Sequence, residues 1–275
     1  MKTTAALQGD VAYYDVYPRE RTGIVDIHQH YMPANGFVDR LLKEMDKAGV
    51  AIACVISSGP NYDDREAAQW RTIFKDFKDR IVGFGSFSPG KHDRTIVDDY
   101  YAKGFRGLKA ISPTDSYDSE DFLAYYERAE EYGMPILFHT GVIARQSTLE
   151  RQDISSRHMR PICLDRIARW CPRLKIIGAH MGDPWFSEAY NMSQKNPNMW
   201  LDISGKGIWL KASAIREHLW IRLRPEKLIF GLDEPPSQYV RTIHAWETIL
   251  YEIGLSENDR DMIFSATARQ IIGRP

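Results

Sequence analysis

Short runs of apolar residues alternate with amphipathic stretches along the chain from residue 24 onward. The runs are four to eight residues long, which is the length expected of buried strands. The pattern predicts eight strands, at residues 24–27, 51–56, 80–87, 105–110, 134–138, 174–179, 199–203 and 227–232.

Between these runs, apolar residues recur at every third or fourth position, which predicts helices that bury one face. Three of the helices end at a glycine just before a strand, at Gly49, Gly104 and Gly133, as expected for a left-handed cap in a short loop. The predicted helices span residues 37–48, 67–77, 95–103, 122–129, 162–170, 184–193, 212–219 and 240–253, and a final helical segment spans 257–272.

Strands and helices alternate without a linker or a low-complexity break. Eight such units predict an α/β fold, a parallel sheet closed into a (β/α)8 TIM barrel, as one domain over residues 1–275. We expect a polar N-terminal extension at residues 1–23 and a long polar loop at 140–161, either an active-site loop or an insertion. A doubly wound open sheet is the main alternative, but its dinucleotide-binding version needs a Gly-x-Gly-x-x-Gly motif after the first strand, and two histidines stand there instead.

The composition excludes several classes of protein. A net charge of −1 and the absence of a basic stripe argue against a nucleic-acid partner. No window approaches the roughly 18 apolar residues needed to cross a bilayer, and the first residues lack the apolar core of a secretory signal. The three cysteines are odd in number, which favours reduced thiols. We therefore expect a cytoplasmic protein with a small-molecule substrate and no membrane partner.

Ionisable residues gather where the predicted strands end. In a barrel the carboxyl ends of all strands form one face, which carries the catalytic groups, so these residues would meet at a single mouth. His28 and His30 share one face of an extended backbone. A lone histidine after a strand is commonly structural, but four histidines placed in this way, with an aspartate, point to a site. The residues at strand ends are His28, His30, Lys109, His139, His180 and Asp233.

Imidazole and carboxylate groups suit zinc, with manganese or iron as alternatives. Three histidines and one aspartate could hold one divalent ion and leave a position open for water. The pKa of a zinc-bound water falls from 15.7 to about 7, so it becomes hydroxide at neutral pH. Asp233 could accept the proton of that water.

The sequence resembles the amidohydrolase superfamily, in particular the amidohydrolase-related group (family 2) of metal-dependent hydrolases and decarboxylases. The resemblance spans nearly the whole chain, and its motifs are specific for the group when taken together. They lie at Asp26–His30, Gly104–Lys109, Pro135–Gly141, Ala179–Gly182 with Pro184 and Trp185, and Ile229–Asp233.

The resemblance implies roles for these residues. His28, His30 and His139 look like metal ligands, and Asp233 looks like a ligand that doubles as the general base. His180 looks like the group that orients the water or stabilises the developing oxyanion. Lys109 has two interpretations. It is either a carboxylated bridge between two metals or a substrate-facing or ion-paired lysine beside a single ion. Members of the group are often dimers or larger, which implies a homo-oligomer.

The loop after the fifth strand is rich in basic residues, and arginine suits the recognition of a planar carboxylate. A solvated surface loop is the alternative explanation for these charges. Trp185 and Trp209 also follow strands, where each forms either an aromatic wall for a substrate or part of the packing. The candidate substrate-binding residues in the loop are Arg145, Arg151, Arg157, His158 and Arg160.

These observations predict a metal-dependent hydrolase that uses a metal-activated water on a small carboxylated amide, lactone or ester. A non-oxidative decarboxylase or a hydratase of a small carboxylic acid is the close alternative, because the same ligands would polarise its substrate. A barrel that has lost activity and serves as a binding module is the alternative from another class. Intact candidate ligands at every position argue against it.

Overall fold

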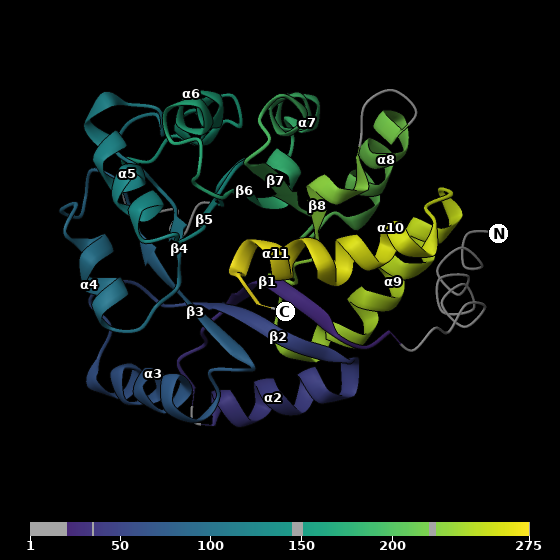
Figure 1. The fold of residues 1–275 in the computed structure, drawn as a ribbon, viewed down its shortest axis with the longest axis horizontal. Helices are drawn as coiled ribbons and strands as arrows, with labels where there is room; N and C mark the ends of the chain where they lie inside the picture. Colours follow the sequence, from purple (N-terminus) through teal and green to yellow (C-terminus); the bar gives the residue numbers. More distant parts are fainter. Residues whose placement is uncertain (1–20, 35, 145–150, 220–223, 275) are drawn as a thin grey trace.

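The computed structural model describes residues 21–34, 36–144, 151–219 and 224–274 (Figure 1). Its eight strands pair in chain order, and every pair is parallel. The predicted TIM barrel is confirmed. The strands are β1 Ile24–His30, β2 Val50–Ile56, β3 Ile81–Phe87, β4 Gly107–Ala110, β5 Ile136–Phe138, β6 Ile176–Gly178, β7 Met199–Asp202 and β8 Leu228–Ile229.

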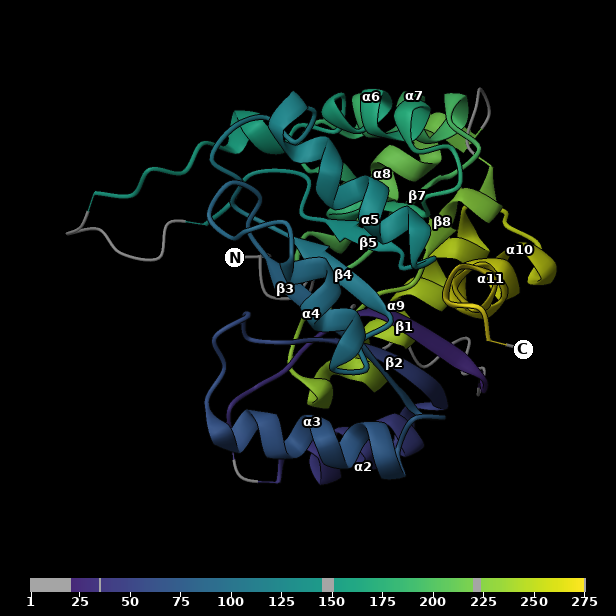
Figure 2. The same cartoon turned by 60° about the vertical axis from the view of Figure 1, so that its left-hand side comes forward.

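Helices surround the sheet (Figures 1 and 2). No helix among the described residues is long and apolar enough to cross a membrane. The helices are α2 Phe37–Ala48, α3 Asp64–Asp76, α4 Ile96–Ala102, α5 Leu123–Glu131, α6 Cys163–Trp170, α7 Phe186–Lys195, α8 Ile208–Leu219, α9 Tyr239–Glu252, α10 Glu257–Asp261 and α11 Thr267–Ile272. Short turns of helix are η1 Glu120–Phe122, η2 Ser156–Met159, η3 Ala179–Gly182, η4 Pro225–Lys227, η5 Pro236–Gln238 and the π-helical turn η6 Met262–Ala266.

Hydrogen bonds continue the sheet from β8 back to β1. The backbone N–H of Ile27 donates to the carbonyl of Phe230 (3.1 Å), and the N–H of Asp233 donates to the carbonyl of His28 (2.7 Å). These bonds place the residues that follow β8 directly beside the end of β1. The histidines of β1 and the aspartate after β8 therefore become neighbours although about 200 residues separate them.

The predicted caps are present at all three glycines, which have positive φ angles. At Gly49 φ is 71°, and its N–H donates to the carbonyl of Met45, which ends α2 one residue before β2. Such a short connection lets helix and strand pack directly against each other.

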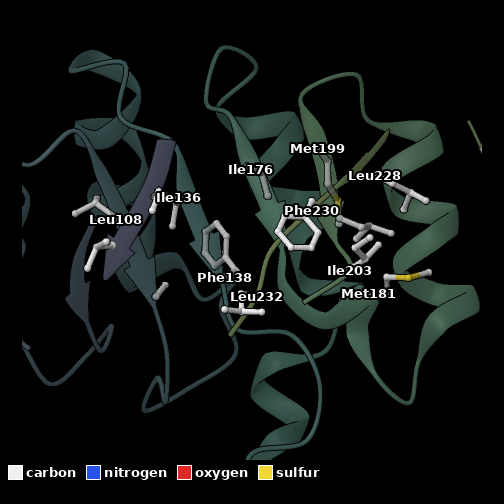
Figure 3. Packing of buried hydrophobic residues seen from close by; sticks show 14 of the residues in the cluster. Leu108, Ile136, Phe138, Ile176, Met181, Met199, Ile203, Leu228, Phe230 and Leu232 are labelled. Carbon is white, nitrogen blue, oxygen red and sulfur yellow. The ribbon is translucent and has the colours of Figure 1, made fainter. Parts of the chain in front are cut away.

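Apolar side chains pack in two layers, one inside the barrel and one between the sheet and the surrounding helices. Figure 3 shows part of the outer cluster, between sheet and helices, with Leu108, Ile136 and Ile176 labelled. The inner cluster is formed by Val25, Ile27, Ile52, Cys54, Ile56, Val82, Phe84, Leu137, Ile177, Ala179 and Ile229, with Ala268 and Ile271 of α11.

The C-terminal segment covers the amino-terminal end of the barrel. Lys175, which precedes β6, donates to the carbonyl of Ile271 (2.7 Å), and Arg274 donates to the carbonyl of Lys78, shortly before β3 (3.1 Å). Ser265 donates to the carbonyl of Gly23, directly before β1 (2.8 Å). The opposite end, where the strands finish, is the one that carries the polar groups.

A β-bulge in β1 aims the histidines. Asp26 pairs with Ala53, but Gln29 pairs with Val55, so β1 holds one extra residue between these pairs. Strict alternation from Val25 and Ile27, which face the barrel interior, would turn His28 outward. The bulge reverses the alternation, and His28 and His30 point into the barrel mouth. The shared face predicted for the two histidines holds, but the bulge that selects the inner face was not predicted.

Aromatic rings pack so closely against the outer face of β3 that only glycine fits beneath them. A methyl group at Gly85 would lie 2.3 Å from Cγ of Tyr100, a fully buried ring of α4. We expect Gly85→Ala to lower the free energy of unfolding by about 1–3 kcal/mol through overpacking. Urea unfolding should show a lower midpoint at an unchanged m-value. An unchanged midpoint would mean that α4 can move away from the strand without cost.

Candidate metal centre

Three predicted ligands meet at the barrel mouth. Nε2 of His28 lies 3.3 Å from Nε2 of His30. The Oδ1 atom of Asp233 lies 3.2 Å from Nε2 of His30 and 3.6 Å from Nε2 of His28. The ligand atoms of the three residues all lie within 4.8 Å of one another, which is the spacing of a group that could hold one ion.

His180 and His139 border this group. Nε2 of His180 lies 3.7 Å from Oδ2 of Asp233, and the rings of His180 and His139 are 5.1 Å apart between centroids. Among the described residues, Nε2 of His139 is a buried nitrogen without a hydrogen-bond partner. His139 therefore stands next to the centre, but it is not within the group of three.

Lys109 lies inside the same site. It is 1% exposed, and its Nζ is 3.1 Å from Nε2 of His28. Burial lowers the pKa of Lys109 to about 8, with the carboxylates of Asp233 and Asp202 acting in the opposite direction. The lysine thus keeps most of its charge at neutral pH, directly against one of the predicted ligands.

Asp202 and Ser204, at the end of β7, were not predicted. Oδ2 of Asp202 accepts a hydrogen bond from Nδ1 of His28 (2.8 Å), and Oδ1 accepts from the backbone N–H of His180 (2.7 Å). The hydroxyl of Ser204 donates to Oδ1 of Asp202 (2.6 Å). Asp202 closes its strand as the other site residues close theirs, so the same rule could have found it.

The protonation states suit a cation. Burial opposes the ionisation of both Asp202 and Asp233, yet the adjacent histidine rings and hydrogen bonds hold the pKa of each carboxyl well below its usual value. Burial, together with the Lys109 charge, lowers the pKa of His28 to about 4 and that of His139 well below 6.5. Neutral imidazoles and ionised carboxylates are the forms that bind metal.

The donor set passes a further test of fit. Because Nδ1 of His28 donates to Asp202, its Nε2 carries a lone pair that faces the Asp233 carboxylate. Such lone pairs repel one another unless a cation offsets them, as the Lys109 ammonium does here at 3.1 Å and as a bound metal ion would do. Asp202 also lies near His28 and His180, but its contact with Nδ1 of His28 is the outer hydrogen bond that commonly orients a metal-binding histidine.

Backbone geometry at the site is unusual. His180, Met181 and Asp233 have φ angles of 58°, 52° and 49°, a region that residues other than glycine seldom adopt. Such conformations concentrate at functional sites, where surrounding contacts enforce them. Gly231 allows a close approach here, since a methyl group on it would lie 2.9 Å from Cβ of His28.

Asp26 ties β1 to the segment after β8. Its Oδ1 accepts from the N–H groups of His28 (2.9 Å) and Leu232 (3.0 Å), and its Oδ2 accepts from the hydroxyl of Tyr239 (2.6 Å). Burial raises the pKa of Asp26 to about 6 although these hydrogen bonds act against the shift. The carboxyl group therefore fixes the backbone on both sides of the ligand atoms.

The predicted substrate-binding residues lie apart from the centre. Arg145 falls outside the described residues, and Arg157 is exposed. Arg160 forms an ion pair with Glu188 and lies 5.3 Å above the ring of Trp185. No contact between these side chains and the histidines of the centre is present in the part of the chain that the structure describes.

His158 and Arg151 do not join the centre in the described contacts either. The carbonyl of His158 accepts from the N–H of Tyr117 (3.1 Å), and Arg151 is exposed. Figure 2 shows the described residues of the 140–161 loop at 142–144 and 151–154 extending away from the barrel. Trp209 is also exposed, on α8. The substrate roles of this loop and of the tryptophans remain predictions.

A cavity of about 430 Å³ adjoins the centre. Two of its lining residues, Gly205 and Glu234, adjoin Asp233. A methyl group on Gly205 would lie 3.3 Å from Oδ2 of Asp233, and Glu234 directly follows Asp233 in the sequence. The cavity is lined by residues Gly205, Lys206, Gly207, Ile208, Trp209, Leu210, Glu234, Gln238, Arg241, Thr242 and Ala245. A space of this size accommodates a small molecule.

Comparisons with known proteins agree with the fold. A family model described as amidohydrolase matches residues 25–274. Among curated proteins, none matches the chain. Solved structures do: 2,6-dihydroxybenzoate decarboxylase from Rhizobium is 15% identical with a TM-score of 0.63, covering 92% of this chain and 99% of its own.

Two further structures are similar. A dihydroxybenzoic acid decarboxylase from Polaromonas, with bound manganese and the inhibitor 2-nitroresorcinol, is 16% identical with a TM-score of 0.64, covering 92% of this chain and 97% of its own. A probable 2-pyrone-4,6-dicarboxylic acid hydrolase from Acinetobacter baumannii, with citric acid bound, is 14% identical with a TM-score of 0.62, covering 92% and 100%. At such identities these structures establish the barrel fold.

The low pKa of His28 generates a pH-dependent stability. An unfolded histidine takes up a proton near pH 6.5, whereas folded His28 does so only at about 4. Between these values the unfolded chain binds more protons, so the free energy of unfolding of the metal-free protein falls as the pH is lowered from 7 to 4. We expect His28 to contribute roughly 3 kcal/mol to this fall, measurable by urea unfolding at several pH values.

The matched control is His244→Asn, on α9 away from the centre. His28→Asn should reduce the slope of stability against pH between pH 4 and 7, with the part due to His139 and His180 remaining, and His244→Asn should leave the slope unchanged. The same slope in both variants would contradict the burial of a neutral His28.

Proposed function

This chain belongs to the amidohydrolase family, and from this premise we propose that it is a metal-dependent enzyme acting on a small carboxylated molecule. The observation that carries the proposal is the convergence of Nε2 of His28, Nε2 of His30 and Oδ1 of Asp233 at the carboxyl end of the barrel. Barrel enzymes place their chemistry at this end. The neutral imidazole of His28 and the ionised carboxylate of Asp233 support the same conclusion.

His28, His30 and Asp233 would hold one divalent ion, and His139, whose buried Nε2 has no hydrogen-bond partner among the described residues, would supply a further ligand. Zinc is our proposal for the ion. Manganese is the alternative, and the decarboxylase from Polaromonas contains it. When bound, the ion would act as a Lewis acid and lower the pKa of a coordinated water.

Asp233 would handle the proton. Its carboxylate is ionised at neutral pH, its side chain is 26% exposed at the mouth, and its Oδ2 faces Nε2 of His180 at 3.7 Å. Asp233 would accept a proton from water. The 3.7 Å between its Oδ2 and Nε2 of His180 is longer than a hydrogen bond, so the proton would reach His180 through a substrate atom that lies between them. Asp202 would keep His28 in the tautomer that binds metal.

The state of Lys109 determines how many metal ions the centre would hold. An ammonium 3.1 Å from Nε2 of His28 competes with a cation at that nitrogen. Binding of a metal there requires that Lys109 turn toward the substrate, lose its proton or become carboxylated. The first two outcomes leave one ion beside a substrate-facing lysine, and the third supplies the bridge for a second ion.

For the reaction, we propose hydrolysis of a carboxylated amide, lactone or ester, with non-oxidative decarboxylation as the second candidate. The hydrolase from Acinetobacter baumannii supports the first, and the decarboxylases from Rhizobium and Polaromonas support the second. The cavity beside Asp233 gives either substrate a place to bind, with Arg241 in its wall for a carboxylate.

Metal analysis of protein purified without chelator tests the proposed centre. We expect about one zinc or manganese ion per chain, lost in His28→Ala and in Asp233→Asn because each removes a ligand atom. His218→Ala is the control, since that ring lies on α8 against Ser187 (3.2 Å). Full occupancy in His139→Ala would remove the strand-five histidine from the ligand set.

Two ions per chain would identify Lys109 as a carboxylated bridge. Protein that binds no metal even after reconstitution with zinc or manganese would favour the binding-module alternative.

Turnover in ¹⁸O-labelled water distinguishes the two reactions. In a screen of carboxylated lactones, amides and dihydroxybenzoates, we expect a lactone or amide to be opened, because an activated water attacks its carbonyl. Mass spectrometry should then find one ¹⁸O atom in the new carboxylate. Release of carbon dioxide from a dihydroxybenzoate, without ¹⁸O in the product, would make the chain a decarboxylase.

A further inference from the structure

Ser204 stands between two histidines of the centre. It follows β7 by two residues and is 1% exposed. Its hydroxyl oxygen lies 3.0 Å from Nδ1 of His28 and 3.0 Å from Nδ1 of His180. The same oxygen lies 2.6 Å from Oδ1 of Asp202. No role follows for this serine from the proposed set of metal ligands.

The number of protons on the Ser204 hydroxyl determines the direction of its three hydrogen bonds. A hydroxyl has one proton to donate and two lone pairs that accept. Oδ1 of Asp202 already accepts from the backbone N–H groups of His180 and Ser204, so it faces donors, and its contact with the Ser204 hydroxyl is the shortest of the three that this hydroxyl makes. The hydroxyl proton therefore goes to Asp202, and the lone pairs of Ser204 remain for the two rings.

The ring of His180 must then supply the proton of its own hydrogen bond. Its Nδ1 faces the Ser204 hydroxyl at 3.0 Å and the Ser204 carbonyl at 3.4 Å, and both oxygens accept. A proton on Nδ1 satisfies this arrangement, whereas a lone pair there would meet only acceptors. In a neutral ring a proton on Nδ1 leaves Nε2 with the lone pair.

We propose that Ser204 is a positioning residue that fixes the neutral His180 ring in its Nδ1–H tautomer. Asp202 does the same for His28 through Oδ2, so one buried Asp202–Ser204 pair sets both rings. Nε2 of His180 then faces Oδ2 of Asp233 as a proton acceptor.

This tautomer narrows the role expected for His180. A neutral ring with a bare Nε2 has no proton to offer an oxyanion at that nitrogen, so it acts first by accepting a proton or by orienting a water. It can donate to an oxyanion only after it has been protonated. The proton on Nδ1 rests on the contacts alone, the lone pair on Nε2 follows for a neutral ring, and the consequence for catalysis rests on the proposed function.

The test is nitrogen NMR of the full chain labelled with ¹⁵N-histidine, loaded with zinc and again after chelation. Long-range ¹H–¹⁵N spectra distinguish a protonated ring nitrogen from one with a lone pair, and comparison with His180→Asn assigns the signals. We expect His180 to carry its proton on Nδ1 in the wild type. In Ser204→Ala, where only the distant carbonyl remains, the population with the proton on Nε2 should grow.

Ser57→Ala is the matched control. Ser57 is also buried at the end of a strand, but its hydroxyl contacts the N–H of Ser86 (3.0 Å) and the hydroxyl of Tyr100 (3.3 Å). It should leave the His180 tautomer unchanged. Once a substrate is known, Ser204→Ala should lower kcat by about 10- to 100-fold with little change in KM, as for other outer residues of metal sites.

A proton on Nε2 of His180 in the wild type would overturn the proposal, and so would a Ser204→Ala spectrum identical to wild type. If Ser204→Ala fails to fold, the wild-type spectrum alone still decides. A chain that binds neither zinc nor manganese would refute the proposed function but leave the tautomer readable.

Discussion

The hydrogen bond between Asp202 and His28 is the interaction on which the polar end of the barrel depends. An ionised carboxylate with no exposure to water is costly unless donors surround it. Asp202 has four, from the ring of His28, the N–H groups of His180 and Ser204, and the Ser204 hydroxyl. Each donor belongs to a residue of the centre, so the carboxylate that they stabilise also fixes their positions.

The same constraint explains the irregular backbone around Asp202. His180 reaches Oδ1 through its backbone N–H while its ring returns to Ser204, and it does so with a φ angle of 58°. On the opposite side, Asp26 holds the bulged end of β1 and the segment before Asp233. The ligand atoms thus sit between two buried carboxyl groups, and hydrogen bonds offset the strain of their backbone.

The fold was predictable because the apolar runs and the helical periodicity agree throughout the chain. The positions of His28, His30, Lys109, His180 and Asp233 were also predictable, since the carboxyl ends of barrel strands share one face. The bulge in β1 was not, because one extra residue leaves no trace in a short apolar run.

Asp202 and Ser204 lie at the end of a predicted strand, as the other site residues do. They were not predicted because neither is a histidine and no motif includes them. The anion site predicted from the basic residues of the 140–161 loop stays a prediction. Their charge suggested an anion site, but charge in a long loop does not determine where its side chains point. Arg160 is already paired with Glu188 and lies over Trp185.

Charge balance at the centre supports the proposed carboxylated substrate better than the loop does. Asp202 and Asp233 are ionised, Lys109 is largely protonated at neutral pH and His28 is neutral, so the group carries one net negative charge. With Lys109 turned toward the substrate and still protonated, a divalent ion would make the group positive by one charge, which would attract a carboxylate. The same attraction serves hydrolysis and decarboxylation. In the proposed enzyme, the choice between the two reactions would depend on the lining of the neighbouring cavity, which the β7–α8 and β8–α9 loops supply, because the proposed ligands suit both.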